Sequence, residues 1–116
     1  MNEDDLLDQL ERVLNERAPL HALHGPFGTF EHTRKILLAQ IRSYERVIAV
    51  EQGKRPTNDQ LDDLARMDQT YVDLIDRATK ERTRLAELEA QMTLLEHRLS
   101  YGKAKRYENA QLARMQ

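Results

Sequence analysis

The residues best suited to chemistry lie near the C-terminus, where bases alternate with tyrosines. Lysine and arginine side chains bind phosphates, and exposed tyrosine rings can stack on unpaired bases. This interleaving predicts contact with single-stranded DNA. The same bases could instead pair with acidic segments of neighbouring subunits, and the sequence leaves both interpretations open. The candidate DNA-binding residues are Arg98, Tyr101, Lys103, Lys105, Arg106 and Tyr107.

No other pattern favours catalysis or a bound metal. His21 and His24 stand three apart in a segment rich in Pro and Gly, with His32 downstream, but no carboxylate or cysteine accompanies them there. The aspartates between residues 59 and 76 are spread around a helix and lack the spacing of a calcium loop, which favours a solvated acidic face. The chain contains no cysteine and therefore no thiolate nucleophile. We expect a non-enzymatic protein without cofactor or metal.

The composition favours long solvated helices. Of 116 residues, 33% are charged and only 5% are aromatic, and the net charge is −2. Charge is segregated, because residues 1–16 and 57–76 are strongly acidic whereas residues 31–56 and 97–116 are basic. The acidic N-terminus does not resemble a signal peptide, and no apolar run approaches a membrane span of about 20 residues. We therefore expect a soluble, cytoplasmic protein that does not enter a membrane.

The fold predicted from hydrophobic periodicity is all-α, a single helical domain over residues 1–116. A helix over residues 1–16 is followed by a loop over 17–29, because Pro19, Gly25-Pro26 and Gly28 interrupt the pattern. Phe27 and Phe30 are expected to hold this loop against the helices. The second helix covers residues 30–52, with one wide apolar stripe, and Gly53 ends it. A Thr57–Gln60 capping box begins a long helix over 57–100, and the basic tail over 101–116 is expected to be helical.

A heptad repeat runs along the predicted long helix. Ten of the eleven a and d positions are apolar, and Glu81 is the exception. At about 1.5 Å per residue the helix would be roughly 63 Å long, more than the second helix can cover, so self-association is the simplest way to bury the seam. Arg84 and Glu89 could pair between parallel strands, but the strand orientation stays open. The predicted oligomer interface is Leu64, Met67, Tyr71, Leu74, Ala78, Leu85, Leu88, Met92, Leu95 and Leu99.

Two segments resemble small coiled-coil proteins of bacteriophages, some of them similar to UvsY-type recombination mediators. The first is Gly53-Lys54-Arg55-Pro56-Thr57, followed by Asp62, Asp63, Ala65, Asp68 and Tyr71, and the second is Ala86-Glu87-Leu88 with the run from Leu95 to Tyr101. The resemblance covers residues 53–101. It implies an oligomeric helical protein that binds single-stranded DNA and helps to load a RecA-like recombinase. Asn58 departs from the acid that usually follows the capping threonine.

The leading functional hypothesis is therefore an oligomeric accessory protein that binds single-stranded DNA and assists recombination or replication. It combines the heptad helix with the basic, tyrosine-containing C-terminus. A structural role, such as a scaffolding or connector protein of a phage-like particle, is the first alternative. A small helical inhibitor of a host protein is the second. The oligomer number and the true partner do not follow from the sequence.

Overall fold

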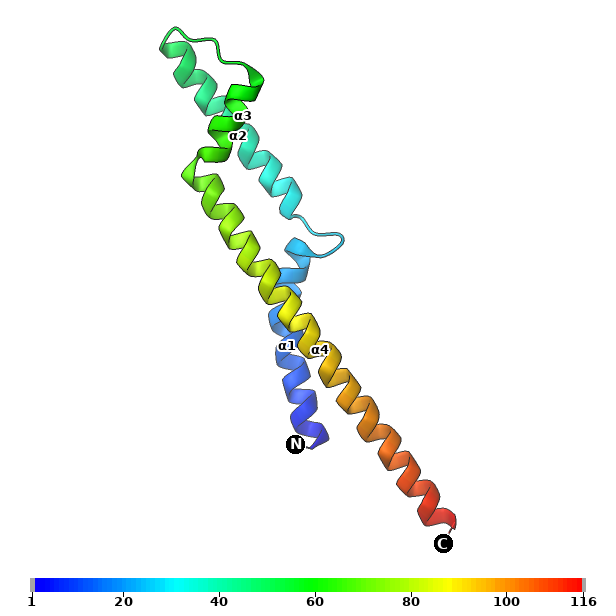
Figure 1. The fold of residues 1–116 in the computed structure, drawn as a ribbon. Coiled ribbons are helices and arrows are strands. Elements are labelled where there is room, and N and C mark those ends of the chain that lie inside the picture. Colours follow the sequence, from blue (N-terminus) through cyan, green and yellow to red (C-terminus); the bar gives the residue numbers. More distant parts are fainter. Residues whose placement is uncertain (1, 116) are drawn as a thin grey trace. The chain divides into compact units, whose positions relative to one another are not determined.

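The computed structural model describes residues 2–115, and these form four helices and no strand. The helices are α1 (Glu3–His24), α2 (Phe30–Glu51), α3 (Asn58–Met67) and α4 (Gln69–Met115), labelled in Figure 1. The predicted all-α class is confirmed. Within the described residues, none of these helices combines the length and the apolarity that crossing a membrane requires.

The first helix is longer than its sequence pattern predicted. α1 continues through Pro19 to His24, so the predicted loop over 17–29 is wrong, and the connection to α2 covers only residues 25–29. Pro19 removes one backbone donor, but Leu20 packs against the core beyond it, and that burial favours continuation of the helix. α1 ends at Gly25-Pro26, where the residue before a proline is disfavoured in helical conformation.

Two of the predicted helix boundaries are confirmed in atomic detail. Thr57 Oγ1 accepts a hydrogen bond from the Gln60 amide at 3.2 Å, and the Gln60 side chain accepts one from the Thr57 amide at 2.9 Å. This is the predicted capping box at the start of α3. Gly53 follows the end of α2 with a φ of 74°, a conformation that glycine adopts at little cost.

The predicted long helix is interrupted at Asp68. Its ψ of 134° is extended, and its side chain accepts a hydrogen bond from the Thr70 amide at 2.9 Å. Asp68 therefore acts as an N-cap for α4, a role that aspartate fills well. The prediction of one helix over 57–100 was wrong here, because hydrophobic periodicity does not register a capping residue in the middle of a heptad pattern.

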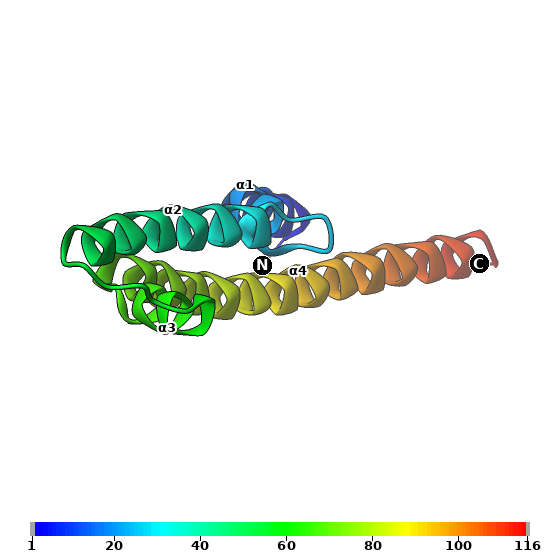
Figure 2. The same ribbon diagram turned by 90° about the horizontal axis from the view of Figure 1, so that it is seen from above.

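Two compact units share α4, where the sequence indicated a single domain. We call residues 22–82 the central unit, and residues 1–21 with 83–116 the terminal unit. In the central unit α2 packs against α3 and the start of α4, and its core contains Ile41, Ala65 and Tyr71 (Figures 1 and 2). Arg42 Nη1 donates to Asp62 Oδ1 at 2.8 Å and joins α2 to α3.

The terminal unit is an antiparallel pair of α1 and the later part of α4. Its core contains Val13, Leu88 and Leu95, and Leu6, Leu10, Leu20 and Met92 pack around them. Ion pairs give the direction: Glu3 pairs with Arg106, and Glu16 pairs with Arg84. Two acids of α1 thus pair with arginines of α4 within one chain.

Five of the ten heptad residues predicted to form an oligomer interface are core residues of the chain itself. Leu64 and Met67 stand on α3 and are exposed, Met67 by 77%. Leu74, Met92 and Leu99 are half-buried. The expectation of self-association assumed that only α2 could cover the long helix. Because α1 extends over Glu3–His24, it also packs against part of α4. The buried members are Tyr71, Ala78, Leu85, Leu88 and Leu95.

Candidate functional site

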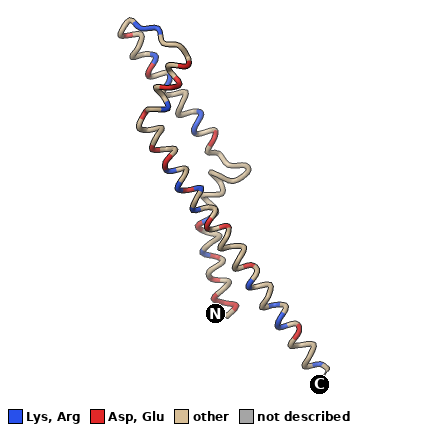
Figure 3. The backbone as a smooth tube through the Cα atoms, viewed as in Figure 1, with Lys and Arg blue, Asp and Glu red and all other residues tan. Residues whose placement is uncertain are grey.

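All six predicted DNA-binding residues lie on α4, which continues as a helix to Met115. The predicted helical tail is confirmed. Figure 3 shows basic residues along this part of α4 and acidic residues along α1. All six side chains are exposed, Tyr101 by 70% and Tyr107 by 68%.

The helix divides these residues between different faces. Arg98, Tyr101 and Lys105 follow one another at spacings of three and four, so they share one side of α4. Lys103 and Tyr107 are four apart and share another side. Tyr101 and Tyr107 are six apart, so at about 100° per residue they point roughly 120° away from each other. One continuous strand along a single helix face cannot stack on both rings.

A groove in the terminal unit collects four of the six residues. Its volume is about 690 Å³, a size typical of small-ligand sites. Leu6 and Leu99 supply apolar surface, and Gly102 leaves room beside the helix backbone. Glu3 and His97 also line it. The predicted residues that it brings together are Arg98, Tyr101, Lys105 and Arg106, whereas Lys103 and Tyr107 lie outside it.

One base of the groove is already paired. Arg106 Nη1 lies 2.7 Å from Glu3 Oε2, an ion pair that joins α4 to the first turn of α1. Both side chains are accessible to solvent, so the pair contributes little to stability. The Glu3 carboxylate does, however, offset the positive charge of Arg106, so Arg106 attracts an anion in the groove less strongly. Charge segregation predicts that these bases pair with acidic segments, but it does not identify Glu3, which lies 103 positions away in the sequence.

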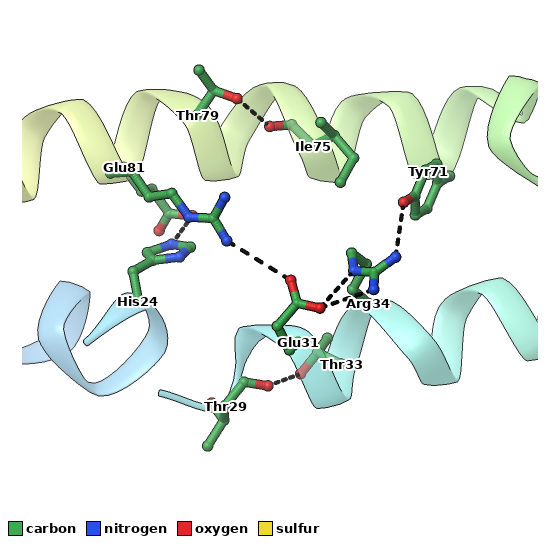
Figure 4. A network of polar contacts seen from close by, with 10 residues as sticks. His24, Thr29, Glu31, Thr33, Arg34, Tyr71, Ile75, Thr79 and Glu81 are labelled. Atoms are coloured by element: carbon green, nitrogen blue, oxygen red, sulfur yellow. Dashed lines mark hydrogen bonds and ion pairs between the residues drawn. The ribbon is translucent and has the colours of Figure 1, made fainter. Parts of the chain in front are cut away.

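A second polar cluster lies in the central unit, where His24 meets α4. The His24 side chain is fully buried, and its Nε2 hydrogen bonds to Glu81 Oε1 at 3.4 Å (Figure 4). The centres of the His24 and Phe30 rings are 5.1 Å apart. The guanidinium of Arg82 lies 4.9 Å from the centre of the Phe30 ring. Glu81, the polar residue of the heptad seam, therefore accepts a hydrogen bond from the end of α1.

Arg34 extends this cluster along α2. It donates Nη2 to Glu31 at 2.8 Å and Nη1 to the Tyr71 hydroxyl at 3.3 Å (Figure 4). The hydrogen bond from Arg34 lowers the pKa of Glu31, and the charges of Arg34 and Arg82 add to this effect. Among residues 2–115, no group of three histidine or acidic side chains could hold a metal ion. The contacts of this cluster join the end of α1 and the start of α2 to α4.

The loop between α1 and α2 is held by only one of its two phenylalanines. Phe30 is buried, but Phe27 is 97% exposed, so the expectation for Phe27 was wrong. Phe27 follows Pro26 in a five-residue connection, and the close approach of Gly28 to the backbone of Leu23 gives this connection its path. Side-chain polarity alone does not reveal which of two neighbouring aromatic rings turns inward.

Arg84 and Glu89, the two flanking residues expected to pair between strands, have partners within the terminal unit. Arg84 donates Nε and Nη2 to the two carboxylate oxygens of Glu16 at 2.7 and 2.8 Å, and Arg17 lies 3.5 Å from Glu89. The hydrogen bond from Arg84 is the largest effect on Glu16 and lowers its pKa below the ordinary value, and the arginine charge adds to it.

Arg84→Ala is therefore expected to raise the pKa of Glu16 toward its ordinary value, as followed by NMR titration of the carboxyl group. Since the folded pKa lies below the unfolded one, the pair stabilises the fold above about pH 4.3, and this is lost as pH falls through the folded pKa. Arg12→Ala is the control, because Arg12 contacts Asp8 and not Glu16. An unchanged Glu16 titration in Arg84→Ala would show that the bidentate contact does not persist in solution.

The structure also divides the apolar stripe of α2, which the sequence presented as one wide face. Leu37, Leu38 and Ile41 face the core of the central unit. A second group faces outward with 44–64% of each side chain exposed, namely Ile36, Tyr44, Val47 and Val50. The spacing of this second group was visible in the sequence. That it remains uncovered was not.

Comparison of the chain with family models, with curated proteins and with solved structures gives no significant match.

Proposed function

We propose that the protein binds single-stranded DNA in the groove between α1 and α4 and serves as a non-enzymatic accessory factor in recombination or replication. The observation that carries this proposal is the gathering of Arg98, Tyr101 and Lys105 on one side of α4, lining a groove of about 690 Å³. Two basic side chains and one aromatic ring are typical of sites that bind single-stranded DNA, because the basic side chains contact phosphates and the ring stacks on a nucleobase.

The shape and surface of the groove suit an unstacked nucleotide. Leu6 and Leu99 offer apolar surface to a base, while Arg98 and Lys105 stand where they can contact the flanking phosphates. Neither base has an ion-pair partner among the described residues. Their charges are therefore available to an anion. A few phosphate contacts give weak binding, with an affinity that falls as salt rises.

Fluorescence anisotropy with a labelled single-stranded oligonucleotide tests the proposal. The triple variant Arg98→Ala, Tyr101→Ala, Lys105→Ala is expected to bind at least tenfold more weakly, since base stacking alone contributes about 1–3 kcal/mol. The matched control is Lys103→Ala with Tyr107→Ala, which removes a lysine and a tyrosine from the same helix but outside the groove. We expect a much smaller change for this control.

Glu3→Gln is expected to change the DNA affinity in the opposite direction. It removes a carboxylate from the groove and releases Arg106, so the affinity should rise. Equal losses of DNA affinity in the groove variant and in the control would show that the groove is not the DNA-binding site. No salt-dependent binding at micromolar protein would remove DNA binding altogether.

The resemblance of residues 53–101 to UvsY-type mediators adds a RecA-like recombinase as a proposed partner. A scaffolding or connector role is the second candidate, and the uncovered apolar residues of α2 favour it. Contacts between protein chains alone would suffice for that role. A stable assembly without affinity for single-stranded DNA would support this candidate over the first.

A further inference from the structure

The outward face of α2 carries a second heptad pattern, distinct from the one along α4. Starting from Ile36, steps of four, three, four and three residues give one straight seam. Such alternation is typical of a helix that packs against a partner helix. Every member of the seam is exposed in the structure, and the set is Ile36, Gln40, Ser43, Val47 and Val50.

The opposite side of the same helix is occupied. Leu37, Leu38 and Ile41 pack into the core of the central unit, and Arg42 pairs with Asp62 of α3. Neither α3 nor α4 covers the outward seam, since its residues stay exposed. α2 therefore presents two apolar faces and uses only one of them within the chain.

The charges beside the seam favour a second copy of the chain in parallel orientation. With Gln40 and Val47 at a positions, Arg46 falls at g and Glu51 at the following e position, five residues later. In a parallel pair, g of one helix faces the next e of the other, so each Arg46 would face Glu51 of the other copy. In an antiparallel pair Arg46 would face Ala39, and Glu51 would face Leu37, so the charges would be left unpaired.

Two further features fit this arrangement. Val47 at a and Val50 at d are apolar and stand at the end of α2 where the two charges lie. Gln40 at an a position and Ser43 at a d position are polar, and polar residues at core positions can fix the register of two-stranded coils. Arg46 also lies 3.4 Å from Asn58, but the guanidinium has five N–H donors and can serve both partners.

We propose that α2 forms a parallel, in-register homodimer contact through Ile36, Gln40, Ser43, Val47 and Val50, flanked by Arg46–Glu51 pairs between the two copies. The contact is independent of DNA. It differs from the oligomer expected from the heptads between residues 64 and 99, because half of those ten residues are buried within one chain.

Sedimentation equilibrium at micromolar concentrations measures the first consequence. The wild-type chain should show twice its mass of 13.6 kDa, and Val47→Asp should return it to the single-chain mass with unchanged helix content by circular dichroism. Val47→Ile is the matched control and should remain dimeric, since a β-branched residue is retained at the a position. A wild-type chain that stays monomeric at all concentrations would overturn the proposal, as would a dimer that Val47→Asp leaves intact.

Charge exchange tests the pairing. Arg46→Glu should weaken the dimer roughly tenfold, because two attractive pairs become repulsive. Combining it with Glu51→Arg should restore the wild-type dissociation constant. A double variant as weak as the single one would mean that these side chains do not face each other.

Disulfide trapping tests the orientation, and the absence of native cysteine makes single-cysteine variants unambiguous. Val50→Cys should form a covalent dimer about tenfold or more faster than Lys35→Cys, whose side chain points away from the seam. Equal rates would overturn the contact. A disulfide formed preferentially between Ile36→Cys and Val50→Cys chains after mixing would mean an antiparallel pair and would overturn the parallel assignment.

Discussion

Leu88→Ala should lower the free energy of unfolding by about 2–5 kcal/mol, measured by urea denaturation followed by circular dichroism. Leu88 is 0% exposed and lies in the core of the terminal unit with Val13 and Leu95. Truncation removes apolar contacts and leaves a cavity that two helices alone cannot close. This core is small, so one large side chain makes up an unusual share of it.

Leu94→Ala is the matched control. Leu94 lies on the same helix six residues away but is 51% exposed, so its loss should change stability by no more than about 0.5 kcal/mol. If the two variants were equally stable, α1 would not be packed on α4 in solution. The α4 seam would then be available to another chain, as its heptad pattern first indicated.

Gly28→Ala should destabilise the protein by about 1–3 kcal/mol, an effect typical of an added methyl group in a packed site. A Cβ at Gly28 would overlap the carbonyl oxygen of Leu23 and would lie 2.6 Å from its carbonyl carbon. Both atoms belong to the backbone at the end of α1, so a side-chain rotation cannot relieve the contact. The connection over 25–29 would have to move.

Gly102→Ala is expected to have the opposite sign. Gly102 lies within α4, and a Cβ there would meet no atom within 4 Å. Alanine should therefore stabilise the helix by up to about 1 kcal/mol. Thermal unfolding of both variants checks the pair. Similar changes in Tm for the two would show that the close approach at Gly28 is not maintained, or that residue 102 is not helical in solution.

Local signals in the sequence were sufficient for the helical class and for two of its boundaries. Thr57 and Gln60 form a reciprocal pair of hydrogen bonds within four residues, and Gly53 adopts a positive φ that few other residues tolerate. The helical C-terminus followed from residue propensity alone. These features depend on neighbours in the chain, and a pattern of residue types contains that information.

Helix ends that hydrophobic periodicity does not register were predicted less well. Pro19 suggested a stop, yet α1 continues because Leu20, half-buried beyond it, packs against the core of the terminal unit. Asp68 lies in an unbroken heptad pattern, yet it caps a new helix. At Pro19 the local preference is worth a few kcal/mol, and a contact with another helix outweighs it. At Asp68 the cause is a local side-chain cap, which hydrophobic periodicity does not register.

The candidate DNA-binding site was likewise predictable from the sequence only in part. Residue types alone selected the bases and tyrosines between Arg98 and Tyr107, since their chemistry needs no knowledge of the fold. Tertiary structure decided that Arg98, Tyr101 and Lys105 share a groove with Leu6, that Lys103 and Tyr107 lie outside it, and that Glu3 pairs with Arg106. It also decided that the α4 seam is covered by the chain's own helices while the α2 seam is left exposed. Periodicity shows that a helix has an apolar face, but only packing determines which surface covers it.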